Sequence, residues 1–360
     1  MDKVIANSIL YVFLSIFYFL STFYFSSLIQ EEWFYSFLTI LRFIVLFSVA
    51  IIIFNFARVS KLDFLVLLVA LALYSTSDKF LNPLGLLLLI SLVFSFYFWK
   101  NRESQQSIAK IDGLLYTNIL GFWIIVLLGY TGVMPSYTYF DNGEYAVALR
   151  SSLGFLNPNP ASIMILQSVF LSRLSNRKII FWLSTFSYLI TLPYLASRTS
   201  FLVFCVFVLL VFFLRNKINL IKTASYSFLI FLVSFPYLVL RYIANSDWIF
   251  FNINLDLLLT TRLSRLKELY DITGLGLFPN FFDYNLDMAF GNMLLKGGLF
   301  IYFAFVVLSF LYVRKEKEFI FLVLFFLMLC FSMAESIYNS SYIFTMLVLA
   351  RIIFVLVRGK

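Results

Sequence analysis

The sequence predicts an all-α polytopic membrane protein with about twelve transmembrane helices. Hydrophobic residues make up 62% of the 360-residue chain and charged residues only 12%, whereas a soluble domain has about 25% charged residues. No soluble fold of this length has enough interior to bury so much Phe, Leu, Ile and Val. Lipid must therefore cover part of the surface, and the apolar residues come in runs long enough to cross a bilayer.

The individual spans follow from those runs, because a hydrocarbon core of about 30 Å needs about 20 apolar residues in a helix. The third span is the weakest, since its apolar core runs only from Phe64 to Tyr74. The first run is followed by no small-residue cleavage site, so we expect it to remain as a helix and not to be a signal peptide. The predicted spans are 4–25, 33–56, 64–77, 81–99, 113–133, 158–173, 179–197, 199–214, 223–241, 293–313, 319–334 and 341–357.

The charges between these spans predict an orientation. Of the 27 Lys and Arg residues, 17 lie in segments on the same side as the two termini, and eight lie on the other side. The acidic residues divide the other way, with 12 of 18 on the second side. The positive-inside rule therefore places both termini in the cytoplasm. Because the net charge of +9 is explained by this orientation signal, we expect no nucleic-acid partner.

The chain is predicted to be a single integral membrane domain over residues 1–360, without an internal repeat or a linker. Residues 134–157 and 242–292 are the only long stretches outside the predicted spans, and both fall on the outer side. We expect amphipathic helices in these two large extracytoplasmic loops. In the second loop, the leucines of residues 255–269 follow helical spacing. Any chemistry is therefore expected at the outer face of the membrane.

The composition also excludes several kinds of site. Histidine is absent, which removes the commonest metal ligand and the usual acid–base group near neutral pH. Cys205 and Cys330 lie inside apolar runs, where cysteine behaves as a small hydrophobic residue. Since no cluster of cysteines or carboxylates replaces histidine, the sequence predicts neither a metal site nor a cofactor.

Arginine residues on the outer side are the first functional candidates. Arg150 precedes Asn157-Pro158-Asn159-Pro160, a turn signal at the entrance to the sixth span. Arg198 lies in the very short connection between the seventh and eighth spans, at a depth where an unpaired charge is costly. Both could bind an anion. Alternatively, both are interfacial residues whose charged ends reach water.

The second loop and the following spans supply the other candidates. Arg262 and Arg265 are three residues apart on the predicted amphipathic helix, so both could reach one bound anion. The alternative is that they belong to an ordinary solvated face. Asp287 and Glu335 are carboxylates on the same side, and partial burial would raise the pKa of either one and favour proton abstraction near neutral pH. Either could instead be a salt-bridge partner of the arginines.

Five segments of the chain follow the order known from one family of membrane proteins. They are Arg150 to Asn159, an Arg…Gly-Phe…Asn segment; Ser197-Arg198-Thr199-Ser200, a Ser-Arg-small hairpin; Thr261-Arg262-Leu263 to Gly274-Leu275-Gly276, an arginine followed by Gly-x-Gly; Asp287 to Leu299, which opens the tenth span; and Glu335, which ends the eleventh span. With twelve spans, cytoplasmic termini and large outer loops after the fifth and ninth spans, most of the chain resembles the Wzy-type polysaccharide polymerases, relatives of the O-antigen ligases.

This resemblance implies a GT-C-like glycosyltransferase in a bacterial plasma (inner) membrane. Such an enzyme transfers a growing glycan from undecaprenyl pyrophosphate to the non-reducing end of a lipid-linked repeat unit at the outer face. The implied partners are the undecaprenyl-pyrophosphate-linked oligosaccharide, the lipid bilayer and a chain-length regulator. Arginine guanidinium groups would stabilise the leaving pyrophosphate through bidentate hydrogen bonds, without a metal. The implied site residues are Arg150, Asn159, Arg198, Arg262 and Arg265 for the pyrophosphate, and Glu335 or, as second choice, Asp287 for the acceptor proton.

Three alternatives stay open. A flippase for the same lipid-linked unit has a similar number of spans, but transporters usually have repeats and polar groups near the midplane. Here only Arg42 and Arg351 lie deep inside predicted spans. An O-antigen ligase-like transferase tends to carry an outer histidine, and a membrane acyltransferase an intramembrane one. The absence of histidine disfavours both.

Overall fold

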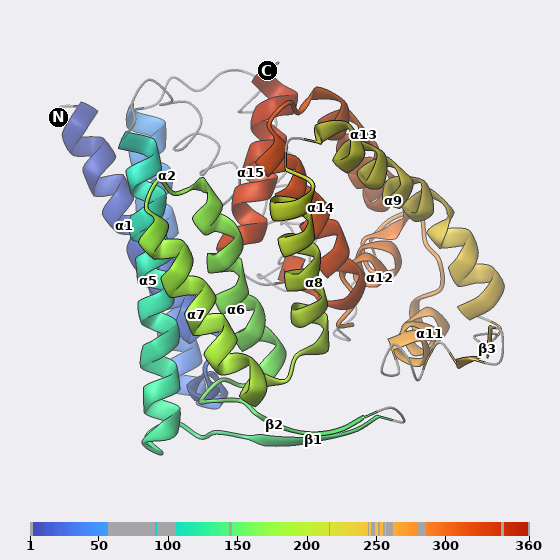
Figure 1. The fold of residues 1–360 in the computed structure, drawn as a ribbon, viewed down its shortest axis with the longest axis horizontal. Coiled ribbons are helices and arrows are strands. Elements are labelled where there is room, and N and C mark those ends of the chain that lie inside the picture. Colours follow the sequence, from blue (N-terminus) through green and yellow to red (C-terminus); the bar gives the residue numbers. More distant parts are fainter. Residues whose placement is uncertain are drawn as a thin grey trace.

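The structure is a computed structural model that is mainly helical (Figure 1). It describes residues 3–56, 91, 106–143, 146–215, 217–243, 245, 249–250, 253–254, 256, 262–279, 286–339 and 342–358. The predicted spans 64–77 and 81–99 lie outside the described residues, except for residue 91.

Twelve α-helices form the described part of the chain. Short π-helical segments, Leu209–Phe213 and Val239–Ile243, extend α8 and α9. The helices are α1 (Lys3–Phe23), α2 (Glu32–Phe56), α5 (Gln106–Tyr130), α6 (Pro158–Leu171), α7 (Lys178–Leu195), α8 (Arg198–Val208), α9 (Ile218–Leu238), α11 (Arg262–Thr273), α12 (Ala289–Leu295), α13 (Gly298–Lys315), α14 (Phe319–Ala334) and α15 (Ile343–Arg358).

Four of these helical segments are long and apolar enough to cross a membrane, which indicates a membrane protein. Shorter apolar stretches occur in α1, α8, α14 and α15. Helices also cover each of the other predicted spans within the described residues, but the total of about twelve membrane crossings stays a prediction. The four long segments are Ile111–Tyr130, Lys178–Leu195, Ile218–Ile243 and Gly298–Lys315.

The first outer loop differs from the prediction. An amphipathic helix in residues 134–157 is wrong, because this loop forms an antiparallel β-hairpin of β1 (Thr138–Gly143) and β2 (Ala146–Ser151). The β-branched and aromatic residues of these segments favour strands, and an Asn-Gly pair interrupts any helical pattern there. Thr138 lies opposite Ser151 in the register, so the hairpin returns the chain to the bundle next to where it left.

The second outer loop contains the predicted amphipathic helix. It is α11, and its leucines Leu263, Leu266 and Leu269 are buried. A short hairpin of β3 (Ile249–Phe250) and β4 (Ile253–Asn254) precedes it. The helical spacing of the leucines therefore predicted this helix correctly, and these leucines form its buried face.

The predicted tenth span, 293–313, is not one continuous helix. The chain forms α12 and α13 with a break at residues 296–297. Gly298 has a φ of +76°, and a β-carbon at this position would lie 2.6 Å from the carbonyl oxygen of Phe278. Only glycine fits this left-handed conformation and close approach, so the chain changes direction here.

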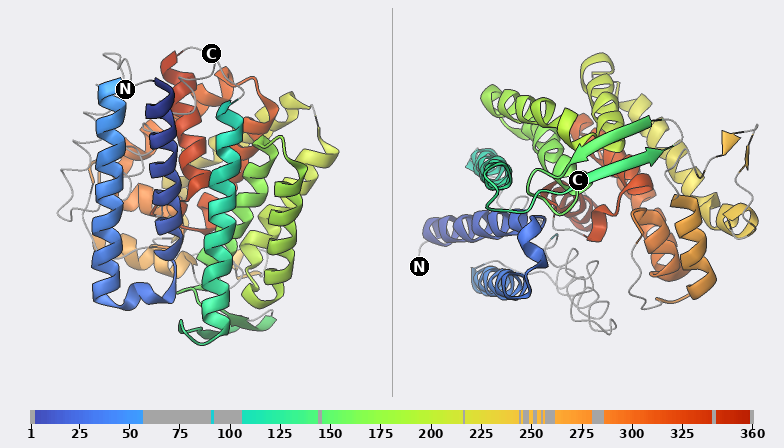
Figure 2. Two further views of the ribbon diagram at one scale, coloured as in Figure 1. Left: turned by 90° about the vertical axis from the view of Figure 1, so that its left-hand side faces the viewer. Right: turned by 90° about the horizontal axis from the view of Figure 1, so that it is seen from below.

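The two ends of the bundle differ in what they carry. Both termini lie at one end, and the β1–β2 hairpin, α11 and the α7–α8 connection lie at the opposite end (Figure 1 and Figure 2). Helix α6 is buried along nearly its whole length, and α14 is buried along most of it. Asn118 of α5 donates to the carbonyl oxygen of Met164 (3.0 Å) and contacts Ser168 (2.6 Å) of α6. The centre of the bundle is thus held by polar contacts as well as apolar packing.

A buried ion pair stabilises the end of the bundle that carries the termini. Arg351 of α15 donates from Nε to Glu316 Oε2 at 2.9 Å and from Nη2 to Glu318 Oε1 at 2.8 Å. Arg351 and Glu316 are each only 2% exposed. Arg42, the other arginine inside a predicted span, is buried with its guanidinium 4.6 Å from the ring centroid of Tyr24. The contacts of Arg42 and Arg351 are thus with protein side chains inside the bundle, as expected for arginines with a structural role.

We expect the replacement Arg351→Ala to destabilise the fold by about 3–5 kcal/mol, because it leaves the Glu316 carboxylate buried without its counter-ion. Thermal unfolding of the purified protein in detergent measures this. The double variant Arg351→Met/Glu316→Gln should recover most of the loss. As a control, Arg265→Ala removes an ion pair whose side chains are 53% exposed and should cost less than about 1 kcal/mol. Equal losses in the buried and exposed pairs would contradict the expectation.

Candidate functional site

The short connection between α7 and α8 lies at the centre of a polar cluster. Only Ala196 and Ser197 separate the two helices. Ala196 has a left-handed conformation with a φ of +43°, and its amide donates to the carbonyl oxygen of Leu192 at 2.8 Å. This sharp reversal directs the first turn of α8 toward the start of α6 and the strand β2.

Arg150 of β2 joins three elements at this connection. Its Nε donates to the carbonyl oxygen of Leu195, the last residue of α7, at 3.0 Å. Its Nη2 donates to the Oδ1 atom of Asn159 in the first turn of α6. The backbone N–H of Asn159 donates in turn to Oδ1 of the N-cap residue Asn157 at 2.9 Å. The guanidinium is thus held in one place by the end of α7 and the start of α6.

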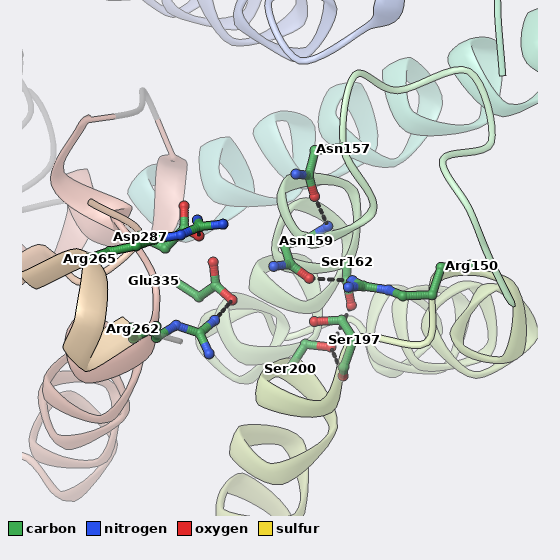
Figure 3. Close-up of polar contacts among 10 residues, drawn as sticks. All are labelled: Arg150, Asn157, Asn159, Ser162, Ser197, Ser200, Arg262, Arg265, Asp287 and Glu335. Carbon is green, nitrogen blue, oxygen red and sulfur yellow. Dashed lines mark hydrogen bonds and ion pairs between the residues drawn. The ribbon is translucent and has the colours of Figure 1, made fainter. Parts of the chain in front are cut away.

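Hydroxyl groups connect the first turns of α6 and α8. Ser162 Oγ and Ser200 Oγ are 2.5 Å apart, and Ser200 Oγ also donates to the carbonyl oxygen of Ser197 at 3.0 Å. Tyr188 of α7 contacts Ser200 Oγ at 3.3 Å. Two helix N-termini, each with a partial positive charge, therefore lie next to each other and beside Arg150 (Figure 3).

An ion pair faces this cluster from the other side. Arg262, the first residue of α11, lies with its Nη2 atom 3.4 Å from Oε1 of Glu335, which directly follows α14. The Arg262 and Glu335 side chains are 13% and 7% exposed. Behind them, Asn292 Nδ2 donates to the carbonyl oxygen of Leu286 (2.7 Å) and to Ser336 Oγ (3.1 Å). These contacts fix the start of α12 against the segment that carries Glu335.

The surroundings of Glu335 change the pKa of its carboxyl group. Burial raises the pKa of this carboxyl to about 7. The positive charges of Arg262 and Arg150 and a hydrogen bond with the Thr199 side chain act against burial, while the negative charge of Asp287 adds to it. A carboxyl group with this pKa can both accept and release a proton near neutral pH.

The structure brings some of the predicted residues together and leaves others at the edge. Arg150, Asn159, Arg262 and Glu335 converge from four separate elements (Figure 3). Arg265 and Asp287 form a second pair at 3.4 Å, but both of their side chains are 53% exposed. Arg198 is also exposed, at the first position of α8. These last three residues border the site.

Sequence reasoning missed the hydroxyl residues of the site. Ser162, Ser197, Thr199 and Ser200 lie around Arg150 and Glu335. The signal for Ser197, Thr199 and Ser200 was the run of small polar residues on either side of Arg198, and nothing indicated Ser162. In the part of the chain that the structure describes, no group of three or more Cys, Asp or Glu side chains is placed to hold a metal ion. The polar chemistry of the described site is that of guanidinium, hydroxyl, amide and carboxyl groups.

We expect infrared spectroscopy to show the carboxyl band of Glu335 appearing as the pH falls through about 7, and this band should be missing in Glu335→Gln. Arg262→Ala should move the midpoint to higher pH, because the guanidinium stabilises the charged form of the carboxyl. Asp287→Asn should move it to lower pH, because it removes a negative charge. A wild-type midpoint at an ordinary glutamate pKa of about 4.3 would contradict this account of the site.

Comparisons with known proteins do not assign the chain to a family. No family model matches it, and no curated protein or solved structure matches it. What can be concluded about the site therefore rests on the arrangement of its side chains and on their charges.

Proposed function

We propose that this protein is a polysaccharide polymerase that uses a lipid-linked donor. It transfers a growing glycan from undecaprenyl pyrophosphate to the non-reducing end of a lipid-linked repeat unit. The observation that carries this proposal is that the positive charges of Arg150 and Arg262, from separate segments of the chain, both act on the Glu335 carboxyl. Two guanidinium groups next to a carboxyl of pKa about 7 suit a reaction with an anionic leaving group and an acceptor proton.

The chemical step assigns a role to each group. The acceptor hydroxyl oxygen forms a bond to the anomeric carbon of the donor glycan, and the bond from that carbon to the diphosphate oxygen breaks. The electron pair of the broken bond stays on the diphosphate, where Arg150 and Arg262 stabilise the developing charge. The acceptor proton passes to Glu335. Asn159 holds Arg150 in place, and Arg198 and Arg265 add positive charge at the edge of the site.

The pairing of Arg262 with Glu335 suggests how donor binding prepares the base. The contact of Arg262 Nη2 with Glu335 Oε1 is long, at 3.4 Å, so a phosphate oxygen can replace the carboxylate as a partner of Arg262. Without the ion pair, the pKa of the Glu335 carboxyl is higher, so the carboxylate accepts the proton of the acceptor hydroxyl more readily. Without a donor, the carboxylate remains paired with Arg262.

The proposed membrane arrangement follows the loop charges. The chain crosses a bacterial plasma membrane about twelve times, with both termini in the cytoplasm. The site lies at the end of the bundle opposite the termini (Figure 1), which this orientation assigns to the outer face. The lipid-linked oligosaccharide reaches it from the bilayer, and a chain-length regulator is a further proposed partner. The flippase alternative predicts a different phenotype.

A cell that lacks the gene should accumulate single lipid-linked repeat units on the outer face of the membrane, because export still works and chain growth does not. Extraction of the lipids after treatment of intact cells with a membrane-impermeant glycosidase measures their location. Complementation with the wild-type gene is the control and should restore polymer. Units that accumulate on the cytoplasmic face would instead identify a flippase.

In a reconstituted assay with a defined lipid-linked repeat unit, we expect Arg150→Lys and Arg262→Ala each to lower the transfer rate about a hundred- to a thousand-fold. Lysine cannot donate to Leu195 and Asn159 at the same time with a planar fork, so Arg150→Lys tests geometry at constant charge. The matched control is Arg241→Ala, which removes an exposed arginine from the π-helical segment after α9. Wild-type rates in both site variants would refute the proposal.

A further inference from the structure

We propose that the Ser197 hydroxyl is a direct ligand of the diphosphate group and that, with the first turn of α8, it forms the anion seat between Arg150 and Arg262. This inference deepens the proposed function and rests on it. The ligand class is a diphosphate, which can belong to a prenyl lipid or be free in solution. Three observations support the assignment.

The first observation is that the Ser197 hydroxyl is buried but not satisfied. The residue is 3% exposed, and its Oγ has no hydrogen-bond partner among the described residues. The neighbouring hydroxyls of Ser162, Ser200 and Tyr188 all have partners. A buried hydroxyl without a partner costs free energy, so a group that supplies the missing hydrogen bond would stabilise this arrangement.

The second observation concerns the position of Ser197 in α8. It is the N-cap residue of this eleven-residue helix, yet its side chain makes no capping hydrogen bond. A serine at this position ordinarily accepts a hydrogen bond from an amide of the first helical turn. Here the hydroxyl leaves that role unfilled, and the helix N-terminus keeps its partial positive charge for an external anion.

The third observation is the placement of Ser197 within the site. Its neighbour Thr199 contributes a hydrogen bond to Glu335, and Arg150 is bonded to Leu195, two residues before it. In Figure 3, Ser197 is drawn in the same cluster as Arg150, Asn159 and Glu335. A diphosphate held by Arg150 and the start of α8 would therefore lie close to this hydroxyl.

The chemistry of these groups favours a diphosphate over a simple carboxylate. Two guanidinium groups and a helix N-terminus approach from different directions, and a diphosphate presents charged oxygens in several directions. A hydroxyl that donates to such an oxygen forms a short, charge-assisted hydrogen bond. No proton leaves Ser197, and no covalent bond to it forms. Its role is to hold the phosphate while the glycosidic bond breaks.

The test is a binding measurement on the full-length protein in lipid nanodiscs, with farnesyl pyrophosphate and inorganic pyrophosphate as probes. Ser197→Ala should weaken the binding of the diphosphate probe by about 10- to 100-fold, which corresponds to the loss of one hydrogen bond to a charged group. Its thermal unfolding should not change, because no capping bond is lost. Ser197→Thr keeps the hydroxyl and should bind within a few-fold of wild type.

Two further variants separate a ligand role from a structural one. Ser197→Asp is a good N-cap and should keep the fold, while its negative charge abolishes binding. Ser225→Ala is the matched control, because Ser225 of α9 also carries a buried hydroxyl without a partner among the described residues. It should leave the affinity unchanged. Tighter binding of farnesyl pyrophosphate assigns the seat to a prenyl diphosphate, and tighter binding of inorganic pyrophosphate assigns it to free diphosphate.

The outcomes distinguish this inference from the proposed function. If Ser197→Ala binds both probes as tightly as wild type while Arg150→Lys weakens them, the inference about Ser197 is wrong and the proposed function stands. If Arg150→Lys and Arg262→Ala also leave the binding of both probes unchanged, the proposed function itself fails. A Ser197→Ala variant that loses stability in proportion to binding would show a structural role and overturn the assignment.

Discussion

The hydrogen bonds of Arg150 are the constraint on which the site depends. They connect the β1–β2 hairpin to the end of α7 and the start of α6, so a loop outside the predicted spans gains a fixed position on the bundle. Gly154 makes this approach possible. It has a φ of +83°, and a β-carbon there would lie 2.6 Å from the carbonyl oxygen of Ile125. The close contact of this turn with α5 holds the hairpin where Arg150 can reach both helices.

Most of the helices could be predicted from the sequence, because apolar runs of membrane length have few other structures open to them. The β1–β2 hairpin could not, since strand formation depends on neighbours that a sequence does not reveal. The break before α13 was also missed. Gly297 and Gly298 were visible, but a glycine pair inside an apolar run breaks a helix only when a close contact such as that of Gly298 with Phe278 demands it.

Contacts between residues close in the sequence could be predicted at the candidate site, and contacts between distant residues could not. Arg150 and Asn159 are nine residues apart, and the turn residues between them indicated that they belong together. Arg262 and Glu335 are 73 residues apart, and their pairing depends on how α11 packs, which no spacing rule supplies. Nothing in the sequence distinguished Ser197 from the other small polar residues beside Arg198. Its significance lies in burial and in a missing partner, and both are properties of the folded chain.

The charges of the site also fit the sequence of events in the proposed reaction. Arg150 and Arg262, with Arg198 and Arg265 at the edge of the site, outnumber the carboxylates Asp287 and Glu335, so the site has an excess of positive charge. A diphosphate diester brings one negative charge on each phosphate, which balances that excess when the donor binds. As the glycosidic bond breaks, the leaving group gains a further negative charge. At the same step Glu335 takes up the acceptor proton and becomes neutral, so its carboxylate can no longer return to Arg262. The guanidinium is then fully available to the diphosphate at the moment when its charge is largest. In the proposed reaction, a single proton transfer therefore both activates the acceptor and strengthens the binding of the leaving group by the arginines.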